Sequence, residues 1–225
     1  MSVLDQFTCS YLTPAVFTAR AFKAFDSLSG YAVRGRTGKG TKQLIEEVIP
    51  LAVFLRSLEI PQRQVRGRYF PGSQQFDAKL RIRGIEVDHG LLKPSYFIEI
   101  TSAVSPNDHL KREALNLNGF AYSGDDIIRT GSRSTKNVMI TSRAAALNPG
   151  ESITKAAQWI RDALRKKSQI NYRTPCILVV RVEPDHYPSI SDWASLAKIV
   201  RNDVDRTRFE KTYVVHVWTN TVFTV

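Results

Sequence analysis

The sequence predicts an α/β fold: a single domain of residues 1–225 with a central mixed β-sheet flanked by helices. Amphipathic helical segments alternate with strand-like segments along the chain, an order that places helices against the faces of a sheet. The run Pro175–Val182 is continuously apolar, as expected of a strand buried on both faces. With 225 residues, of which 43% are hydrophobic, the chain can bury one full core.

Residues 1–40 are hard to assign: a mixed apolar opening precedes the basic, glycine-rich stretch Gly35–Gly40, which we expect to be flexible. This stretch is not a phosphate-binding P-loop, because that motif needs a glycine where Val33 stands. The segment Thr41–Leu58 is predicted to be a helix that Pro50 kinks, with Glu47 beside its apolar stripe. The stripe consists of Leu44, Val48, Leu51, Leu55 and Leu58.

The next segments predict the centre of the sheet. A strand-like run covers Gln64–Phe70, and two further runs within Phe76–Ala103, joined by a short turn, predict a hairpin. The segment Ser105–Asn118 has the signals of a helix, since Ser105 can cap its start and Gly119 follows its end. We take the core of the fold to comprise residues 41–119 and 174–225, approximately.

A loop-rich insert of about residues 119–150 separates the two parts of this core and contains one strand candidate, Val138–Thr141. A helix from Asn148 to about Lys167 follows, with an inward stripe. That stripe consists of Ile153, Ala157, Ile160 and Leu164. After the strand Pro175–Val182, the sequence predicts a helix at Ser189–Val200 and strands at Thr212–Val217 and Thr221–Val225.

The charge of the chain predicts a polyanionic partner. The formal net charge is +11 and the isoelectric point is near 9.8, which favours nucleic acid over a membrane surface. No apolar run is long enough to cross a bilayer and the first residues do not resemble a secretory signal, so we expect a cytoplasmic protein. The two cysteines, Cys9 and Cys176, lack the spacing of metal ligands.

Two acidic residues of the predicted hairpin are candidates for a metal site. Asp77 opens the first strand and Glu99 lies inside the second, flanked by apolar residues. A carboxylate in an apolar strand is costly unless a cation pairs with it. Glu86 and Asp88 form a second acidic pair, which we interpret as part of the turn.

The order of these elements resembles the PD-(D/E)XK superfamily, which has the restriction-endonuclease-like fold. A helix carrying a glutamate is followed by an aspartate that opens a hairpin, a glutamate on the next strand, and another helix. Phe76-Asp77-Ala78 is similar to the first motif of the family and Glu99-Ile100-Thr101 to the second. The resemblance covers about residues 41–119, and Pro175–Val182 would complete the core.

The resemblance implies a metal-dependent endonuclease that hydrolyses phosphodiester bonds in DNA. Asp77 and Glu99 would bind Mg²⁺, with Mn²⁺ as a substitute, and the carbonyl of Ile100 would be a further ligand. Glu47 would contribute to the metal site from its helix. The cation would polarise the scissile phosphate and activate the attacking water.

The sequence departs from the family at Thr101, where the second motif has its lysine. Lys79, on the Asp77 face, or Lys111, on the following helix, would replace that lysine, and Glu113 is a further catalytic candidate. If no lysine replaces it, the chain would be a catalytically inactive protein that binds nucleic acid or another partner on the same scaffold. A third reading, a nuclease that acts on RNA, differs only in its substrate.

Basic residues close to these motifs in the sequence predict a track for the phosphates of a nucleic acid. They are Arg66, Arg68, Arg81, Arg83, Arg129, Arg133 and Lys136. The sequence leaves open whether the chain acts as a monomer or as a homodimer.

Overall fold

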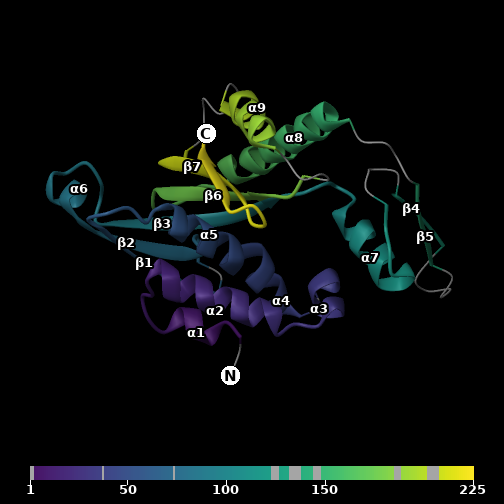
Figure 1. Ribbon diagram of the computed structural model, residues 1–225, viewed down its shortest axis with the longest axis horizontal. Helices are drawn as coiled ribbons and strands as arrows, with labels where there is room; N and C mark the ends of the chain where they lie inside the picture. The colour runs from purple at the N-terminus through teal and green to yellow at the C-terminus, as the bar shows by residue number, and fades with distance from the viewer. Residues whose placement is uncertain are drawn as a thin grey trace.

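The computed structural model describes residues 3–36, 38–72, 74–122, 127–131, 138–143, 148–184, 189–201 and 208–225. Within these residues, six strands form one mixed sheet in the order β1-β2-β3-β6-β7-β8 (Figure 1). The strands are β1 (Arg63–Tyr69), β2 (Ala78–Gly84), β3 (Ser95–Ala103), β6 (Cys176–Val182), β7 (Lys211–His216) and β8 (Thr221–Thr224).

The sheet is antiparallel at both sides and parallel in the middle. β1 pairs with β2 and β2 with β3 as antiparallel neighbours, β3, β6 and β7 run parallel, and β8 returns antiparallel to β7. The predicted hairpin is therefore present, although its turn contains a short helix, α6 (Ile85–Asp88). All seven residues of β6 are buried, as the apolar run predicts.

Helices cover both faces of the sheet. On one face lie α8 (Pro149–Ser168) and α9 (Ile190–Arg201), and on the other lie α1 (Asp5–Thr8), α2 (Pro14–Asp26) and α5 (Ile49–Ser57) (Figure 1). Each layer buries its own hydrophobic cluster against the sheet, the first around Ile160 and Leu178, the second around Phe54 and Ile98. The predicted α/β fold with a central mixed sheet flanked by helices is confirmed.

The predicted helix Thr41–Leu58 is three consecutive pieces. They are α4 (Lys39–Gln43), the π-helical turn η1 (Leu44–Val48) and α5. The ring of Pro50 would clash with a carbonyl one turn earlier in a regular α-helix. The wider π-turn, in which the Ile49 N–H reaches the Leu44 carbonyl, accommodates the proline at the first turn of α5.

Two segments differ from the sequence-based expectation. The first 40 residues are mostly helical, with α2 burying Phe17 and Ala21, and the stretch expected to be flexible contains the end of α3 (Gly30–Gly35) and the start of α4. In the insert, β4 (Ile127–Thr130) pairs with β5 (Met139–Ser142) as a separate antiparallel ladder beside α7 (Asp108–Asn118). Among the described residues, no helix is long and apolar enough to span a membrane.

Candidate active site

The candidate site lies where β2 separates from β3, a position that we call the fork. β2 pairs with Ser95–Ile98 only, so beyond Ile98 the edge of β3 that faces β2 has no strand partner among the described residues. Asp77 fills the first position of this edge: its backbone N–H donates to the Ile98 carbonyl (2.8 Å), and its carboxylate Oδ2 accepts from the Ile100 N–H (2.7 Å). These two bonds flank Glu99 and hold Asp77 beside it.

Glu99 lies on the face of β3 that α8 covers, and it is 7% exposed. Its Oε1 forms an ion pair with the Nζ of Lys167, in the last turn of α8. The Lys167 side chain is itself only 23% exposed. The cost of burying the Glu99 carboxylate is therefore offset by a lysine from a different element, which the sequence-based reading did not identify.

A third carboxylate approaches from the other side of the sheet. Glu47, on η1, accepts a hydrogen bond from the buried hydroxyl of Tyr69, at the end of β1. Burial raises the pKa of Glu47, and the negative charges of Glu46 and Glu99 raise it further, whereas the Tyr69 hydrogen bond and Lys167 lower it. The pKa of Glu47 thus depends on the charges of the Glu99–Lys167 pair.

Asp77 has the most perturbed carboxyl group of the site. Burial raises its pKa from an ordinary value of 3.8 to about 7, and the nearby charges of Glu99 and Glu47 contribute to the rise. The Ile100 N–H and Lys167 act in the opposite direction. Near neutral pH the site therefore holds a carboxyl group close to its titration point, and a cation bound there would favour its charged form.

Tyr172, in the loop before β6, completes the surroundings of Glu99. Burial raises the pKa of its phenol, as do the charge and the proximity of the Glu99 carboxylate. Its buried hydroxyl has no hydrogen bond of normal geometry within the described part of the chain. The site therefore contains a donor that a small reorientation or a bound water could engage.

The other sequence-predicted catalytic residues have different contacts in the structure. Lys79 lies two residues from Asp77, but its ammonium is placed over the Phe97 ring, 5.0 Å from the centroid. Lys111 lines a different cavity, whose lining includes neither Asp77 nor Glu99. Glu113 forms an ion pair with Arg129 of β4 (3.6 Å). Both residues lie on α7, which packs on α3, β4 and β5 (Figure 1).

A sequence signal for Lys167 exists. The inward stripe of its helix, which ends at Leu164, continues at helical spacing to Lys167. α8 precedes β6, and β6 pairs in parallel with β3, so that Cys176 lies opposite Phe97. A lysine on the inner face at the end of α8 therefore reaches the same level of the sheet as Glu99.

Basic side chains cover the outer face of the β1–β2 hairpin. In the register of the two strands Arg66 lies opposite Arg81 and Arg68 opposite Lys79, while Arg83 faces the neutral Gln64. Neither strand contains an acidic residue. Like charges directly opposite each other destabilise a strand pair, so this arrangement, which we call the basic ladder, is suited to an anionic ligand. It begins two residues from Asp77.

The members of the basic ladder differ in solvent exposure and in their contacts with the rest of the chain. Arg66 and Arg83 are exposed. Arg68 donates from Nε to the Thr8 carbonyl (2.6 Å), and the Arg81 guanidinium lies over the Tyr11 ring, 3.9 Å from its centroid. Arg129 lies away from the ladder, in the pair with Glu113, and two other predicted contacts fall outside the described residues. Those two are Arg133 and Lys136.

The donors at the fork fit a hard divalent cation in their chemistry. Asp77 and Glu99 offer carboxylate oxygens, and the Ile100 carbonyl points to the same side as its N–H, toward Asp77, because the two groups of one strand residue do so. Mg²⁺ needs only one or two carboxylates and keeps several waters. Within the described ranges, no group of three or more histidine, cysteine, aspartate or glutamate side chains is gathered as a metal cage.

In comparisons with known proteins, no family model, curated protein or solved structure matches the chain.

Proposed function

We propose that this chain is a metal-dependent nuclease of the restriction-endonuclease-like type that hydrolyses phosphodiester bonds in DNA. The observation that carries the proposal is the joining of Asp77, Glu99 and Lys167 at the fork between β2 and β3. Two carboxylates and a lysine are the chemistry that the PD-(D/E)XK resemblance implies. Lys167 supplies from α8 the ammonium that Thr101 does not provide.

Each residue has a role that follows from its position. Asp77 and Glu99, with the Ile100 carbonyl, would hold Mg²⁺, which polarises a phosphate and lowers the pKa of a bound water. Lys167 would then exchange its bond with Glu99 for contacts to the attacking water or to the phosphate oxygens, whose negative charge grows as the reaction proceeds. Glu47, held by Tyr69, would orient water at the edge of the site.

The basic ladder would guide the substrate to these residues. Cations on one face of a strand recur about every 7 Å, so the ladder is an extended row rather than a point charge. It would hold the phosphate backbone with little regard to base sequence. Because the row begins next to Asp77, a strand bound along β2 would pass the carboxylates.

The experiment that tests this function is a cleavage panel. The wild-type protein is incubated with supercoiled, linear double-stranded and single-stranded DNA and with RNA, in Mg²⁺, in Mn²⁺ and in EDTA. We expect metal-dependent cleavage of DNA, lost in Glu99→Gln and retained in Glu151→Gln, whose carboxylate lies at the opposite end of α8. Cleavage of RNA alone would transfer the proposal to RNA, and cleavage unaffected by Glu99→Gln would refute the assigned site.

A second candidate is a nucleic-acid-binding protein without catalysis. The observation in its favour is that Glu99 and Asp77 already have partners within the chain, Lys167 and the Ile100 N–H. In that case DNA binding depends on the ladder alone. Absence of cleavage on every substrate, together with salt-dependent DNA binding that Arg66→Gln weakens, would favour this candidate.

A further inference from the structure

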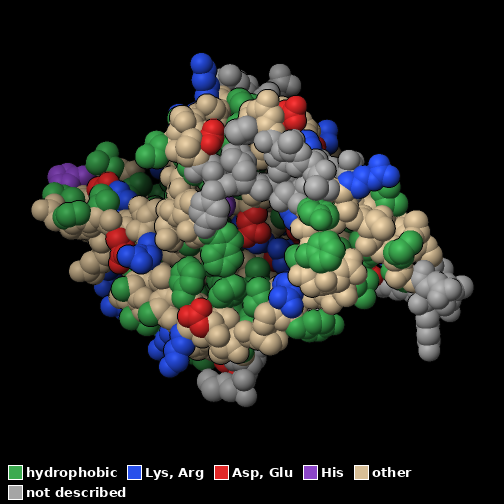
Figure 2. All heavy atoms as spheres, turned by 45° about the vertical axis from the view of Figure 1, so that its right-hand side comes forward, with side chains coloured by type: hydrophobic (Ala, Val, Ile, Leu, Met, Phe, Trp, Pro, Cys, Tyr) green, Lys and Arg blue, Asp and Glu red, His purple; other side chains and the backbone are tan. Residues whose placement is uncertain are grey.

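The cavity that Lys111 lines is unrelated to the fork and lies at the carboxyl ends of the parallel strands. It has a volume of about 390 Å³, within the range of small-molecule sites. Its walls come from the segments that follow β3 and β6, the ends of β7, and from α3, η1 and α7. The carboxyl ends of parallel strands are where open α/β sheets usually bind ligands. Figure 2 shows a hollow near the centre of this side of the molecule, with acidic and basic side chains inside it.

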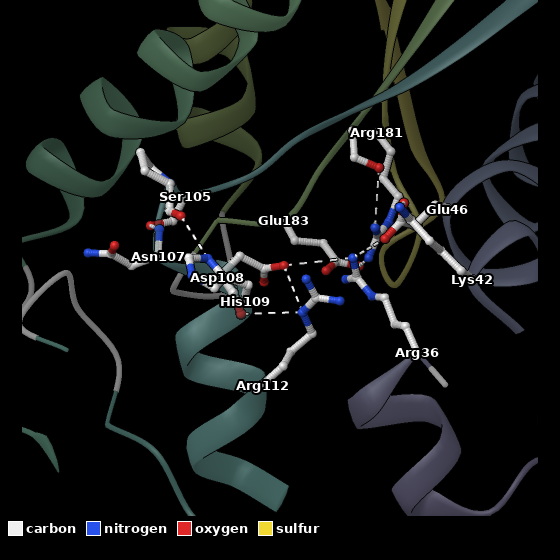
Figure 3. A network of polar contacts seen from close by, with 12 residues as sticks. Arg36, Lys42, Glu46, Ser105, Asn107, Asp108, His109, Arg112, Arg181 and Glu183 are labelled. Atoms are coloured by element: carbon white, nitrogen blue, oxygen red, sulfur yellow. Dashed lines mark hydrogen bonds and ion pairs between the residues drawn. The ribbon is translucent and has the colours of Figure 1, made fainter. Parts of the chain in front are cut away.

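Three arginines from separate elements converge on this cavity (Figure 3). The side chains of Arg36 and Arg181 are 8% and 2% exposed, and that of Arg112 is 25% exposed. Burial at this level is unusual for a cation and needs compensation. We call these three residues the arginine cluster.

Each member of the arginine cluster forms an ion pair with a carboxylate near the cavity. Arg36 pairs with Glu46 (2.5 Å), the Nε of Arg112 with Asp108 (3.0 Å), and Arg181 with Glu183. Two more cations, Arg34 and Lys111, line the same cavity. Among the described residues, the four arginines that line the cavity thus face three carboxylates, and this balance of charge favours an anion.

Arg181 carries the most specific observation. Arg181 is 2% exposed and lines the cavity. Its Nε has no hydrogen-bond partner among the described residues. Its other nitrogens reach Glu183 and Ser102. A buried charged donor without an acceptor is costly, and the oxygen of an anionic ligand would remove that cost. Guanidinium groups prefer planar oxyanions such as carboxylate and phosphate.

Aromatic rings next to the arginine cluster narrow the ligand class. Trp159 and Trp218 line the cavity, and Trp218 is 48% exposed with its ring 5.6 Å from that of Phe25. An exposed indole that lines the same cavity as a cluster of cations can stack on a planar base. From this combination we propose that the cavity binds a 5′-nucleotide, with the phosphate on the arginine cluster and the base against Trp218. The nucleotide is either free or the phosphorylated end of a strand.

Calorimetry with adenosine 5′-monophosphate, inorganic phosphate and a short oligonucleotide, with and without a 5′-phosphate, tests the proposal. We expect nucleotide binding at least 10-fold tighter than that of inorganic phosphate, because only the nucleotide engages the indole. Binding of the monophosphate alone identifies a free nucleotide, and equal binding of the phosphorylated oligonucleotide identifies a strand end. No binding of either at about 1 mM would overturn the proposal, as would inorganic phosphate binding as tightly as the nucleotide.

The variants keep the test independent of folding and of the nuclease. Arg181→Met with Glu183→Gln removes an ion pair without leaving a buried carboxylate unpaired, and Arg112→Met changes a more exposed member of the cluster. Both are expected to weaken nucleotide binding at least 10-fold, a loss of about 1.4 kcal/mol. The control is Arg165→Met, which removes an exposed arginine of α8 and should have no effect. Asp77→Asn should abolish cleavage and leave nucleotide binding intact, so the two sites fail separately. Nucleotide binding unchanged in both cluster variants would overturn the site.

Discussion

Replacement of Asp77 by asparagine should stabilise the metal-free protein above neutral pH. Asparagine has nearly the same shape, and its Oδ1 can still accept the hydrogen bond from the Ile100 N–H. The substitution removes only the charge that burial and the neighbouring carboxylates disfavour. A residue kept for metal binding is thus expected to cost stability in the absence of the metal.

The size of the effect follows from the pKa of Asp77. Its rise from 3.8 to about 7, at about 1.4 kcal/mol for each tenfold change in the acid constant, sets an upper limit of about 4 kcal/mol. Water entry and movement of the side chain reduce this value, and we expect about 2 kcal/mol. Since the folded state binds the Asp77 proton more tightly than the unfolded chain does, the contribution of Asp77 to stability falls as pH rises from about 4 to about 7 and then levels off.

Urea unfolding in EDTA at pH 4, 5, 6, 7 and 8 measures this difference. The free energies of unfolding of wild type and Asp77→Asn should agree near pH 4 and diverge until pH 7, with the variant more stable. Asp88→Asn, which changes an exposed carboxylate of α6, is the control and should follow wild type. A variant that is equally stable or less stable at pH 8 would refute the assignment of a strained carboxylate at this position.

Three further substitutions test other parts of the structure. Lys167→Met should reduce cleavage by about 10²–10³-fold. It should also lower the free energy of unfolding by about 2 kcal/mol, because the Glu99 carboxylate is left buried and unpaired. The control Lys166→Met should change neither quantity. Joint replacement of Arg66 and Arg81 by glutamine should weaken DNA binding and reduce the slope of log K against log salt by about 2; an unchanged slope in a salt titration would show that DNA binds elsewhere. Gly84→Ala should cost at least about 3 kcal/mol in a denaturant titration, because φ is 126° and an added Cβ would lie 2.0 Å from a backbone oxygen; a stability close to that of wild type would contradict the backbone described for the β2–α6 junction.

The sequence predicts the parts of the fold that depend on local patterns. Strand alternation identifies the hairpin and the apolar run identifies β6, because burial on one or two faces imposes the pattern directly. The helix α2 is missed although its buried residues, such as Phe17, Ala21 and Ala24, recur at helical spacing, so the pattern in the sequence is sufficient to predict it. The β4–β5 ladder is too short for a periodic signal.

The sequence alone predicts the two acidic residues of the candidate site, Asp77 and Glu99, but does not predict its lysine, Lys167. Asp77 directly precedes β2 and Glu99 lies on the neighbouring β3, so their proximity follows from the antiparallel pairing of these strands. Lys167 is 68 residues from Glu99 in the chain. Its position depends on the parallel pairing of β3 with β6 and on the packing of α8, neither of which a local pattern specifies. The prediction that Lys111 replaces the motif lysine requires α7 to lie beside the fork. In the structure α7 packs on the strand pair β4–β5 of the insert.

The central claim is that Asp77 and Glu99 together hold a divalent cation, and its most direct test is the anomalous scattering of crystals soaked in Mn²⁺. The account predicts one strong peak between the two carboxylates, about 2.0–2.2 Å from an oxygen of each, with the Lys167 ammonium displaced from Glu99. The peak should be absent in Glu99→Gln and present in Glu151→Gln. A saturated crystal with no peak at the fork, or a peak that persists in Glu99→Gln, would contradict it.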